Sequence, residues 1–152
     1  MNSTLAAVPR RKAAVVAVAL VLVTGCGDGG DAVSGSGAAP STAPGVGEVT
    51  TGADGVQEIT VQTQDDYVFV PDSFTVDPGT VRLTVVNVAE EMTHNFEFTE
   101  GEGPEVIDSG ISLLAPGQEM TIEFEVTAPG DHQYECSFHL QLGQVGTMTV
   151  RG

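Results

Sequence analysis

The sequence predicts an all-β protein, folded as a β-sandwich of about seven strands in two sheets. From Val56 onward, apolar and polar residues alternate with a period of two in several short runs, which is typical of half-buried strands. Glycine, proline and aspartate separate these runs, as expected for turns. The same region has no stretch with the period of a long helix. Many short strands separated by turns favour a two-sheet sandwich.

The first strands are predicted between residues 58 and 87. Residues 58–63 form one run, and residues 67–76 form a second run rich in β-branched and aromatic side chains. Asp77-Pro78-Gly79-Thr80 predicts a turn, because proline fixes φ and glycine accepts conformations that other residues avoid. Residues 81–87 alternate again, so their apolar members are expected on one face of a sheet.

The second half of the domain continues this pattern. Residues 94–98 form a short strand with a histidine and two phenylalanines on one face. Residues 118–126 alternate, and their apolar side chains are expected to point into the core: Met120, Ile122, Phe124 and Val126. A turn at residues 128–131 leads into a strand at 132–136, and residues 147–150 predict the closing strand.

Residues 1–25 predict the signal peptide of an exported lipoprotein. Three basic residues at positions 10–12 precede an apolar run at residues 13–23, which is too short to span a bilayer comfortably. The run ends in Val23-Thr24-Gly25-Cys26, which resembles the bacterial lipobox, whose cysteine is lipidated. We therefore expect export and a lipid anchor on Cys26 at the outer face of the cytoplasmic membrane. The alternative is an ordinary secretory signal with an incidental cysteine.

Residues 26–55 predict a disordered tether between the lipidated Cys26 and a folded domain at residues 56–152. This segment is rich in glycine, alanine, serine, threonine and proline and has no apolar periodicity. Cys136 is then the only thiol of the mature chain, so no internal disulfide can form. Metal ligation would explain a lone cysteine in an exported protein.

The charge of the mature chain restricts its partners. After Cys26 the sequence contains 21 acidic residues but only two basic ones, Arg82 and Arg151. Such a surface repels nucleic acid and anionic membranes, so membrane contact is expected through the lipid anchor only. It would attract a redox protein with a basic docking face, although the charge could equally serve solubility. We expect the protein to be a monomer.

A short loop motif and a histidine far upstream of it predict a metal site. Cys136, His139 and Gln144 follow the spacing C-x2-H-x4-Q between two predicted strands, and His94 lies upstream. Two imidazoles, one thiolate and a weak fourth donor suit a copper ion that changes between its two oxidation states.

This loop, the His94-Asn95 pair and the surrounding strands resemble the cupredoxin family of blue copper proteins. Two further patches extend the resemblance, namely Leu114 to Gln118 and a pattern formed by Phe69, Val70-Pro71, Phe74, Val76 and Pro78-Gly79. The resemblance implies a Greek-key β-sandwich with one copper ion per domain. It also implies that His94, Cys136 and His139 are ligands. Gln144 stands at the axial position, where most of the family has methionine and the stellacyanin-like branch has glutamine.

The resemblance assigns roles to the neighbours of these ligands. Asn95 and Ser137 would tie the two ligand loops together. Leu140, Leu142 and Met92 would form an apolar docking patch around His139. Gln144 could instead point away from the metal, with Met148 as a rival donor, whereas His132 is expected in the core.

The predicted function is single-electron transfer without enzymatic activity. Three histidines in the whole chain cannot build the additional copper clusters of multicopper oxidases, and one sulfur ligand cannot build a binuclear copper centre. The alternatives are delivery or buffering of copper in the cell envelope, or a metal-free interaction module. The donor, the acceptor and the reduction potential stay open.

Overall fold

The computed structural model describes residue 42 and residues 44–152. The predicted signal peptide, Cys26 and most of the predicted tether lie outside these residues. Within them the fold is all-β, which confirms the predicted class, and the one helical segment is the 3-10 turn η1 (Leu140–Leu142). The described part of the chain contains no helix long and apolar enough to cross a membrane.

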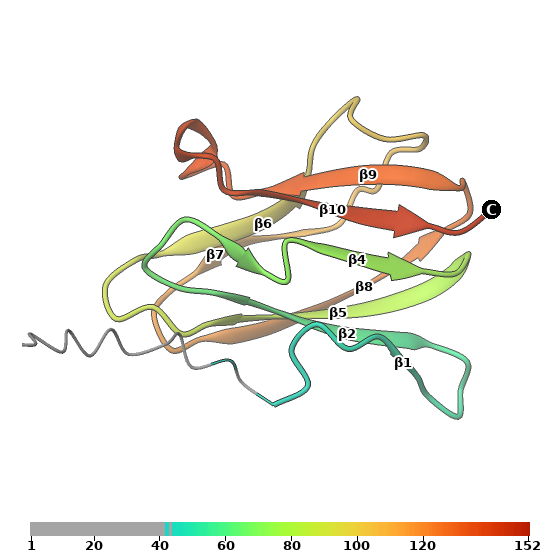
Figure 1. The fold of residues 1–152 in the computed structure, drawn as a ribbon, viewed down its shortest axis with the longest axis horizontal. Coiled ribbons are helices and arrows are strands. Elements are labelled where there is room, and N and C mark those ends of the chain that lie inside the picture. The colour runs from blue at the N-terminus through green and yellow to red at the C-terminus, as the bar shows by residue number, and fades with distance from the viewer. Residues whose placement is uncertain (1–41, 43) are drawn as a thin grey trace, which may run out of the picture. The chain divides into compact units, whose positions relative to one another are not determined.

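The strands form two mixed sheets that pack face to face. One sheet has the order β1-β2-β5-β8, with β3 paired to β2, and the other has the order β4-β10-β9-β6-β7. The first sheet contains β1 (Thr50–Thr51), β2 (Gln57–Thr63), β3 (Phe69–Val70), β5 (Gly79–Asn87) and β8 (Glu119–Val126). The second contains β4 (Ser73–Val76), β6 (His94–Phe98), β7 (Gly110–Leu114), β9 (Gly130–Glu135) and β10 (Val145–Val150). In Figure 1 the layer with β9 and β10 lies above the layer with β2 and β5.

The described residues form ten strands rather than about seven, because β1 and β7 lie where no strand was predicted and one predicted run is divided in two. The predicted run at residues 67–76 is divided into β3 and β4 by Pro71 and Asp72. Proline has no amide hydrogen and interrupts a ladder of backbone hydrogen bonds. Strand β1 pairs only with β2 and is therefore an edge strand.

Part of the segment that precedes the predicted boundary at residue 56 pairs with the sheet. Strand β1 pairs with the start of β2, and Val46 forms an isolated bridge with Thr60. Val46, Thr50 and Thr51 therefore pair with the sheet, although they lie in the segment predicted as the tether. Edge pairing uses backbone hydrogen bonds and requires no buried side chains, so this segment lacks the alternation that identified the other strands.

An aromatic cluster fills the core beneath the ligand loops. The ring of Tyr134 packs against Phe69, Phe74 and Phe96, with centroid distances of 5.2, 5.8 and 4.9 Å. Its hydroxyl donates to the carbonyl of Pro71 at 3.2 Å, and burial raises the pKa of Tyr134 above its ordinary range. These contacts fix the end of β9, which Cys136 directly follows.

The predicted inward face of β8 holds only for the second half of the strand. Phe124 and Val126 are buried, whereas Met120 is 44% exposed. Strand β8 lies at the edge of its sheet, so the alternation of residues gives the correct phase but overstates the burial of its first half.

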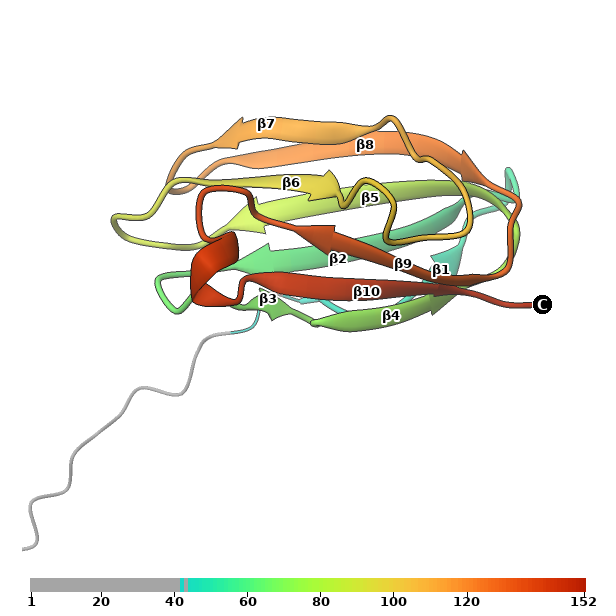
Figure 2. The same cartoon turned by 90° about the horizontal axis from the view of Figure 1, so that it is seen from above.

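Three loops meet at one end of the sandwich. They connect β2 with β3, β5 with β6, and β9 with β10, and Figures 1 and 2 show them together at the end opposite the carboxyl terminus. Residues far apart in the sequence are thereby brought to one place.

Candidate copper site

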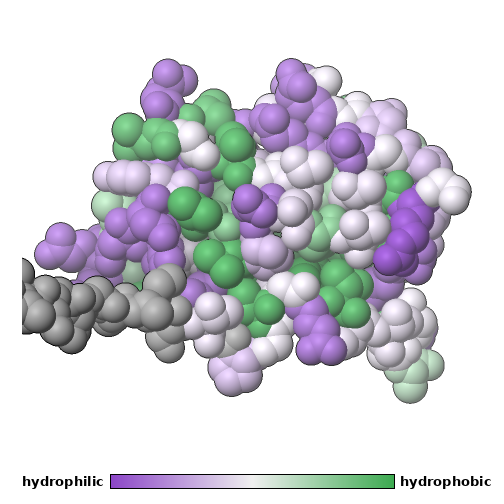
Figure 3. Space-filling model, in the orientation of Figure 1, coloured by the Kyte–Doolittle hydropathy of each residue, from purple (hydrophilic) through white to green (hydrophobic). Residues whose placement is uncertain are grey.

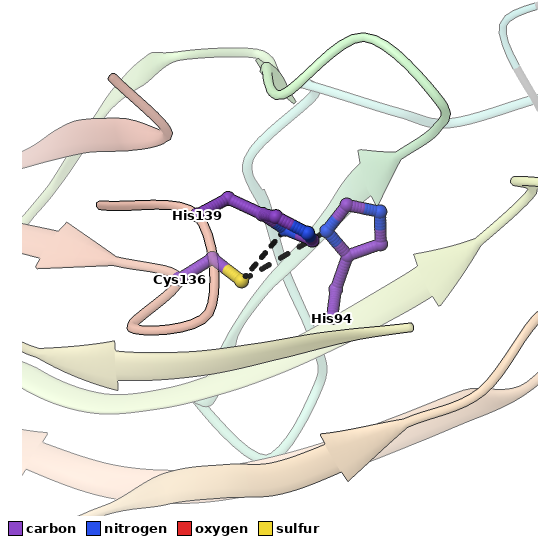
Figure 4. A group of neighbouring side chains, drawn as sticks. All are labelled: His94, Cys136 and His139. Atoms are coloured by element: carbon purple, nitrogen blue, oxygen red, sulfur yellow. Dashed lines mark hydrogen bonds between the residues drawn. The ribbon is translucent and has the colours of Figure 1, made fainter. Parts of the chain in front are cut away.

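Three side chains with metal-binding atoms meet at this end. The candidate ligand atoms of His94, Cys136 and His139 all lie within 4.8 Å of one another, and Figure 4 shows the three side chains converging. The sulfur of Cys136 lies 3.9 Å from Nδ1 of His94 and 3.5 Å from Nδ1 of His139. No second group of three such residues with this spacing occurs in the described part of the chain.

The loop between β9 and β10 is folded so that its two ends meet. Cys136 directly follows β9, and its backbone N–H donates to the carbonyl of Gln144 at 3.1 Å. The N–H of His139 donates to the carbonyl of Cys136 at 3.0 Å, and η1 follows. Gly143 ends this turn with φ of 88°, a left-handed conformation that favours glycine. The turn returns Gln144 to the side of Cys136.

His94 is held against this loop by its neighbour. The register of β6 against β7 shifts between His94 and Phe96, and such bulges re-aim side chains near functional sites. The N–H of Asn95 donates to the sulfur of Cys136 at 3.4 Å. Asn95 also bonds Ser137 twice: its Nδ2 donates to Oγ, and its Oδ1 accepts from the backbone N–H, both at 2.8 Å. The two loops are therefore joined where the resemblance implied.

Gln144 points toward the ligand atoms. Its side chain is fully buried, and its Oε1 lies 2.9 Å from Nδ1 of His94 and 3.1 Å from Nδ1 of His139. The amide oxygen therefore faces the same space as the other donors. This position would allow Gln144 to act as the axial ligand, which stays a prediction.

The rival donor Met148 and the third histidine, His132, are both buried in strands of the second sheet. His132 is buried in β9 with its Nε2 3.2 Å from the carbonyl of Ala128. Met148 is buried in the core and pairs in register with His132.

These donors fit a copper ion. Bonds from a first-row metal such as zinc are about 2.3 Å to sulfur and about 2.0 Å to nitrogen, so neighbouring ligands of a trigonal site lie roughly 3.7 Å apart. The observed sulfur–nitrogen distances of 3.5 and 3.9 Å lie on either side of this value. One thiolate with two imidazoles and a weak axial donor is the set that selects copper.

Burial keeps the deeper imidazole in the form that a metal requires. Desolvation is the largest influence on His94 and lowers its pKa, while the hydrogen bond to Gln144 opposes this and the nearby His139 reinforces it. A lowered pKa favours the neutral ring, which is the form that binds metal.

His139 is only partly buried and adjoins apolar residues in the chain. Its ring is 5.1 Å from that of Tyr67, between the centroids. Leu140 and Leu142, predicted for a docking patch, are 36% and 58% exposed, and Met92 is half-buried. Phe138, which was not predicted for this patch although it adjoins His139, is 51% exposed. Figure 3 shows hydrophobic residues gathered over the loop between β9 and β10.

Comparisons with known proteins agree with this geometry. The family model described as copper binding proteins of the plastocyanin/azurin family matches residues 56–151. Plastocyanin of Cucumis sativus is 39% identical over 89 residues, covering 54% of this chain and 86% of that protein. Plastocyanin of Nostoc punctiforme is 33% identical over 92 residues, covering 55% and 65%.

Solved structures show the same fold. Reduced auracyanin from the photosynthetic bacterium Roseiflexus castenholzii matches with a TM-score of 0.56 and 26% identity, covering 62% of this chain and 97% of that one. Auracyanin B matches with a TM-score of 0.55 and 23% identity, covering 74% and 100%. With the family match over residues 56–151 and the donor set described above, the chain belongs to the plastocyanin/azurin family of copper-binding proteins, the cupredoxins.

Proposed function

We propose that this protein carries single electrons between redox proteins of the cell envelope. Copper supplies a reversible one-electron change when it is bound by His94, Cys136 and His139. The observation that carries the proposal is the convergence of these three donor atoms, with the amide oxygen of Gln144 2.9 and 3.1 Å from the two imidazoles. A site filled by protein donors leaves little room for a substrate, which favours transfer over catalysis.

The surrounding residues support transfer by holding the ligands still. Asn95 bonds both the sulfur of Cys136 and the backbone and side chain of Ser137. Hydrogen bonds outside the ligand shell fix ligand orientation. Ligands that move little when the charge of the site changes keep the reorganisation small, so electrons can pass in both directions.

The surface around His139 is the proposed docking site for the redox partner. Phe138, Leu140 and Leu142 are exposed residues beside His139 in the chain, and the half-buried Met92 lies two residues before His94. An apolar patch of this kind excludes water when a partner binds. The acidic composition of the chain favours a partner with a basic face around the contact.

The proposed location is the outer face of the cytoplasmic membrane. This part of the proposal rests on the sequence of residues 1–26 alone, with Cys26 as the lipidated residue. We propose that the protein acts as a monomer and touches the membrane only through this anchor.

The experiment that tests the function is a joint visible and EPR spectrum of the Cu(II)-loaded protein, followed by reduction and reoxidation. We expect an intense thiolate-to-copper band, a small copper hyperfine splitting, and copper that is retained through repeated cycles. Copper released on reduction would favour the alternative of delivery or buffering. A pale tetragonal signal would contradict the electron-carrier function.

A further inference from the structure

We infer that Thr63 is a positioning residue, which determines that the oxygen end of the Gln144 amide faces the copper site. This inference rests on the copper site described above. The Nε2 of Gln144 donates to the hydroxyl of Thr63 at 2.7 Å, while Oε1 faces His94 and His139 at 2.9 and 3.1 Å. Thr63 and Gln144 are 81 residues apart in the sequence and both are fully buried.

The two ends of a glutamine amide differ in chemistry but hardly in size. The oxygen can donate electrons to a metal, whereas the NH₂ group is a hydrogen-bond donor and cannot. Shape therefore does not decide which end faces the site, and the hydrogen bonds do. In the described part of the chain, Thr63 provides the one acceptor for Nε2.

The fold holds this acceptor in place. Thr63 is the last residue of β2 and pairs in register with Asn87 of β5 and with Phe69 of β3. Its carbonyl accepts a hydrogen bond from the N–H of Val88 at 2.9 Å. A β-branched side chain in a strand has restricted rotation, so the hydroxyl has a defined position relative to Gln144.

Removing the Thr63 hydroxyl should reverse the preference for the orientation in which the Gln144 oxygen faces the copper site. In Thr63→Val the shape is nearly kept, but the buried NH₂ group has no acceptor, which is costly. The amide then lacks the hydrogen bond that holds it in its present orientation. It is expected to turn, and the copper site would lose its oxygen donor. Because hard oxygen donors favour Cu(II) over Cu(I), we expect the ratio of Cu(II) to Cu(I) affinity to fall about tenfold, as for one lost hydrogen bond.

The test compares the full chain with the variants Thr63→Val and Thr63→Ser, each alone and in a Gln144→Met background. The readouts are the midpoint potential and the EPR spectrum. We expect Thr63→Val to raise the potential and change the EPR anisotropy, and Thr63→Ser, which keeps the hydroxyl, to match the parent protein. With methionine at position 144 the Thr63→Val change should disappear. An unchanged potential in Thr63→Val, or an equal shift in both backgrounds, would overturn the inference.

A second measurement needs neither copper nor a folded variant. In the metal-free parent protein, NMR should show side-chain NH₂ protons of Gln144 that exchange slowly with solvent, whereas those of the exposed Gln141 exchange rapidly. Equal, rapid exchange at both residues would refute the contact with Thr63. If the parent protein formed no blue copper site, the proposed function would fail, and this NMR result would still decide the hydrogen bond.

Discussion

At the scale of single residues, the site depends on the burial and the donor strength of each candidate ligand. His94 and Cys136 are fully buried, while His139 is partly exposed. The copper ion would therefore lie beneath one imidazole that reaches the surface. Gln144 differs from these three because its oxygen is a weak donor, and its contribution is expected to appear in the reduction potential rather than in binding itself.

Gln144→Met is therefore expected to raise the midpoint potential. A thioether is softer than an amide oxygen and favours Cu(I). We expect the ratio of Cu(I) to Cu(II) affinity to rise by about one to two factors of ten. At about 59 mV for each factor, this corresponds to a rise of about 60–120 mV. Spectroelectrochemical titration measures the shift, with Gln141→Met, an exposed position in the same loop, as the control. An unchanged potential would argue against axial ligation by Gln144.

The sequence was sufficient to point to the candidate donors and to the tie between Asn95 and Ser137, but not to the contacts that Thr63 and Tyr67 make with them. Cys136, His139 and Gln144 lie within one loop, so their joint position followed from the motif. Thr63 and Tyr67 belong to a different part of the chain and carry no metal-binding pattern. Their contacts with Gln144 and His139 depend on how β2 and the following loop approach the site, which alternation of residues does not determine.

At the scale of elements, the pairing of β9 with β10 makes the site possible. Gly146 lies opposite Tyr134 in this register. A Cβ atom at Gly146 would collide with Cζ, Cε2 and the hydroxyl oxygen of Tyr134. Glycine is therefore required where the ring crosses the neighbouring strand.

Gly146→Ala is expected to destabilise the protein by about 1–3 kcal/mol or more, since overpacking a filled core forces side chains and backbone to shift. Urea denaturation of the metal-free protein measures the change in the free energy of unfolding. Val145→Ala, at a residue that is 38% exposed, serves as the control and should change it by about 0.5 kcal/mol or less. Equal stability of Gly146→Ala and the parent would show that the ring can move aside.

A second element-scale feature is the tie between the loop after β6 and the turn after β8. The carboxylate of Glu105 accepts from the N–H groups of Thr127 and Ala128 at 2.7 and 2.9 Å and from the Thr127 hydroxyl at 2.9 Å. The backbone bonds from Ala128 and Thr127 are the main cause that lowers the pKa of Glu105. The ionised form is thus favoured in the folded state.

The contribution of Glu105 to stability should depend on pH. A carboxyl group with a lowered folded pKa stabilises the protein above its unfolded pKa, about 4.3 for glutamate, and loses this effect as pH falls through the folded value. Glu105→Gln should therefore be less stable than the parent at pH 7, and the difference should shrink below about pH 4. Chemical denaturation at both pH values measures it. A difference that stays constant would mean that the charge of Glu105 does not contribute.

The boundaries of elements were the least predictable feature. The long alternating strands β5 and β8 were found close to their true limits. Strand β1 was missed because an edge strand of two residues makes backbone bonds without burying a side chain. Whether residues 1–41 anchor the protein remains a prediction from their sequence.

At the scale of the whole molecule, the dominant property is negative charge. The chain has 21 acidic and 5 basic residues, for a formal net charge of −16. Of the basic residues in the described part, Arg82 pairs with Glu58 and Glu123, and Arg151 pairs with Asp77. The surface is thus expected to present a strong negative field to any approaching molecule. Fields of this size steer charged partners and are screened by salt.

Electron transfer to small reagents should reveal this field directly. The rate of oxidation by the cation hexaammineruthenium(III) should fall several-fold as ionic strength rises from about 0.01 to 0.5 M, over which the Debye length shrinks from about 30 Å to a few Å. The rate with the anion ferricyanide should rise over the same range, because screening weakens repulsion. Stopped-flow absorbance of the thiolate-to-copper band follows both reactions. Uncharged reagents provide the control, with a rate that salt leaves nearly unchanged.

The two reagents separate the two roles left open for the acidic surface. Opposite salt dependences would mean that the negative field acts at the point where electrons leave the site, as a partner with a basic face requires. Rates that are insensitive to salt with both reagents would mean that the charges lie too far from His139 to steer a partner. The acidic composition would then serve solubility, and the docking face would depend on the apolar residues around His139.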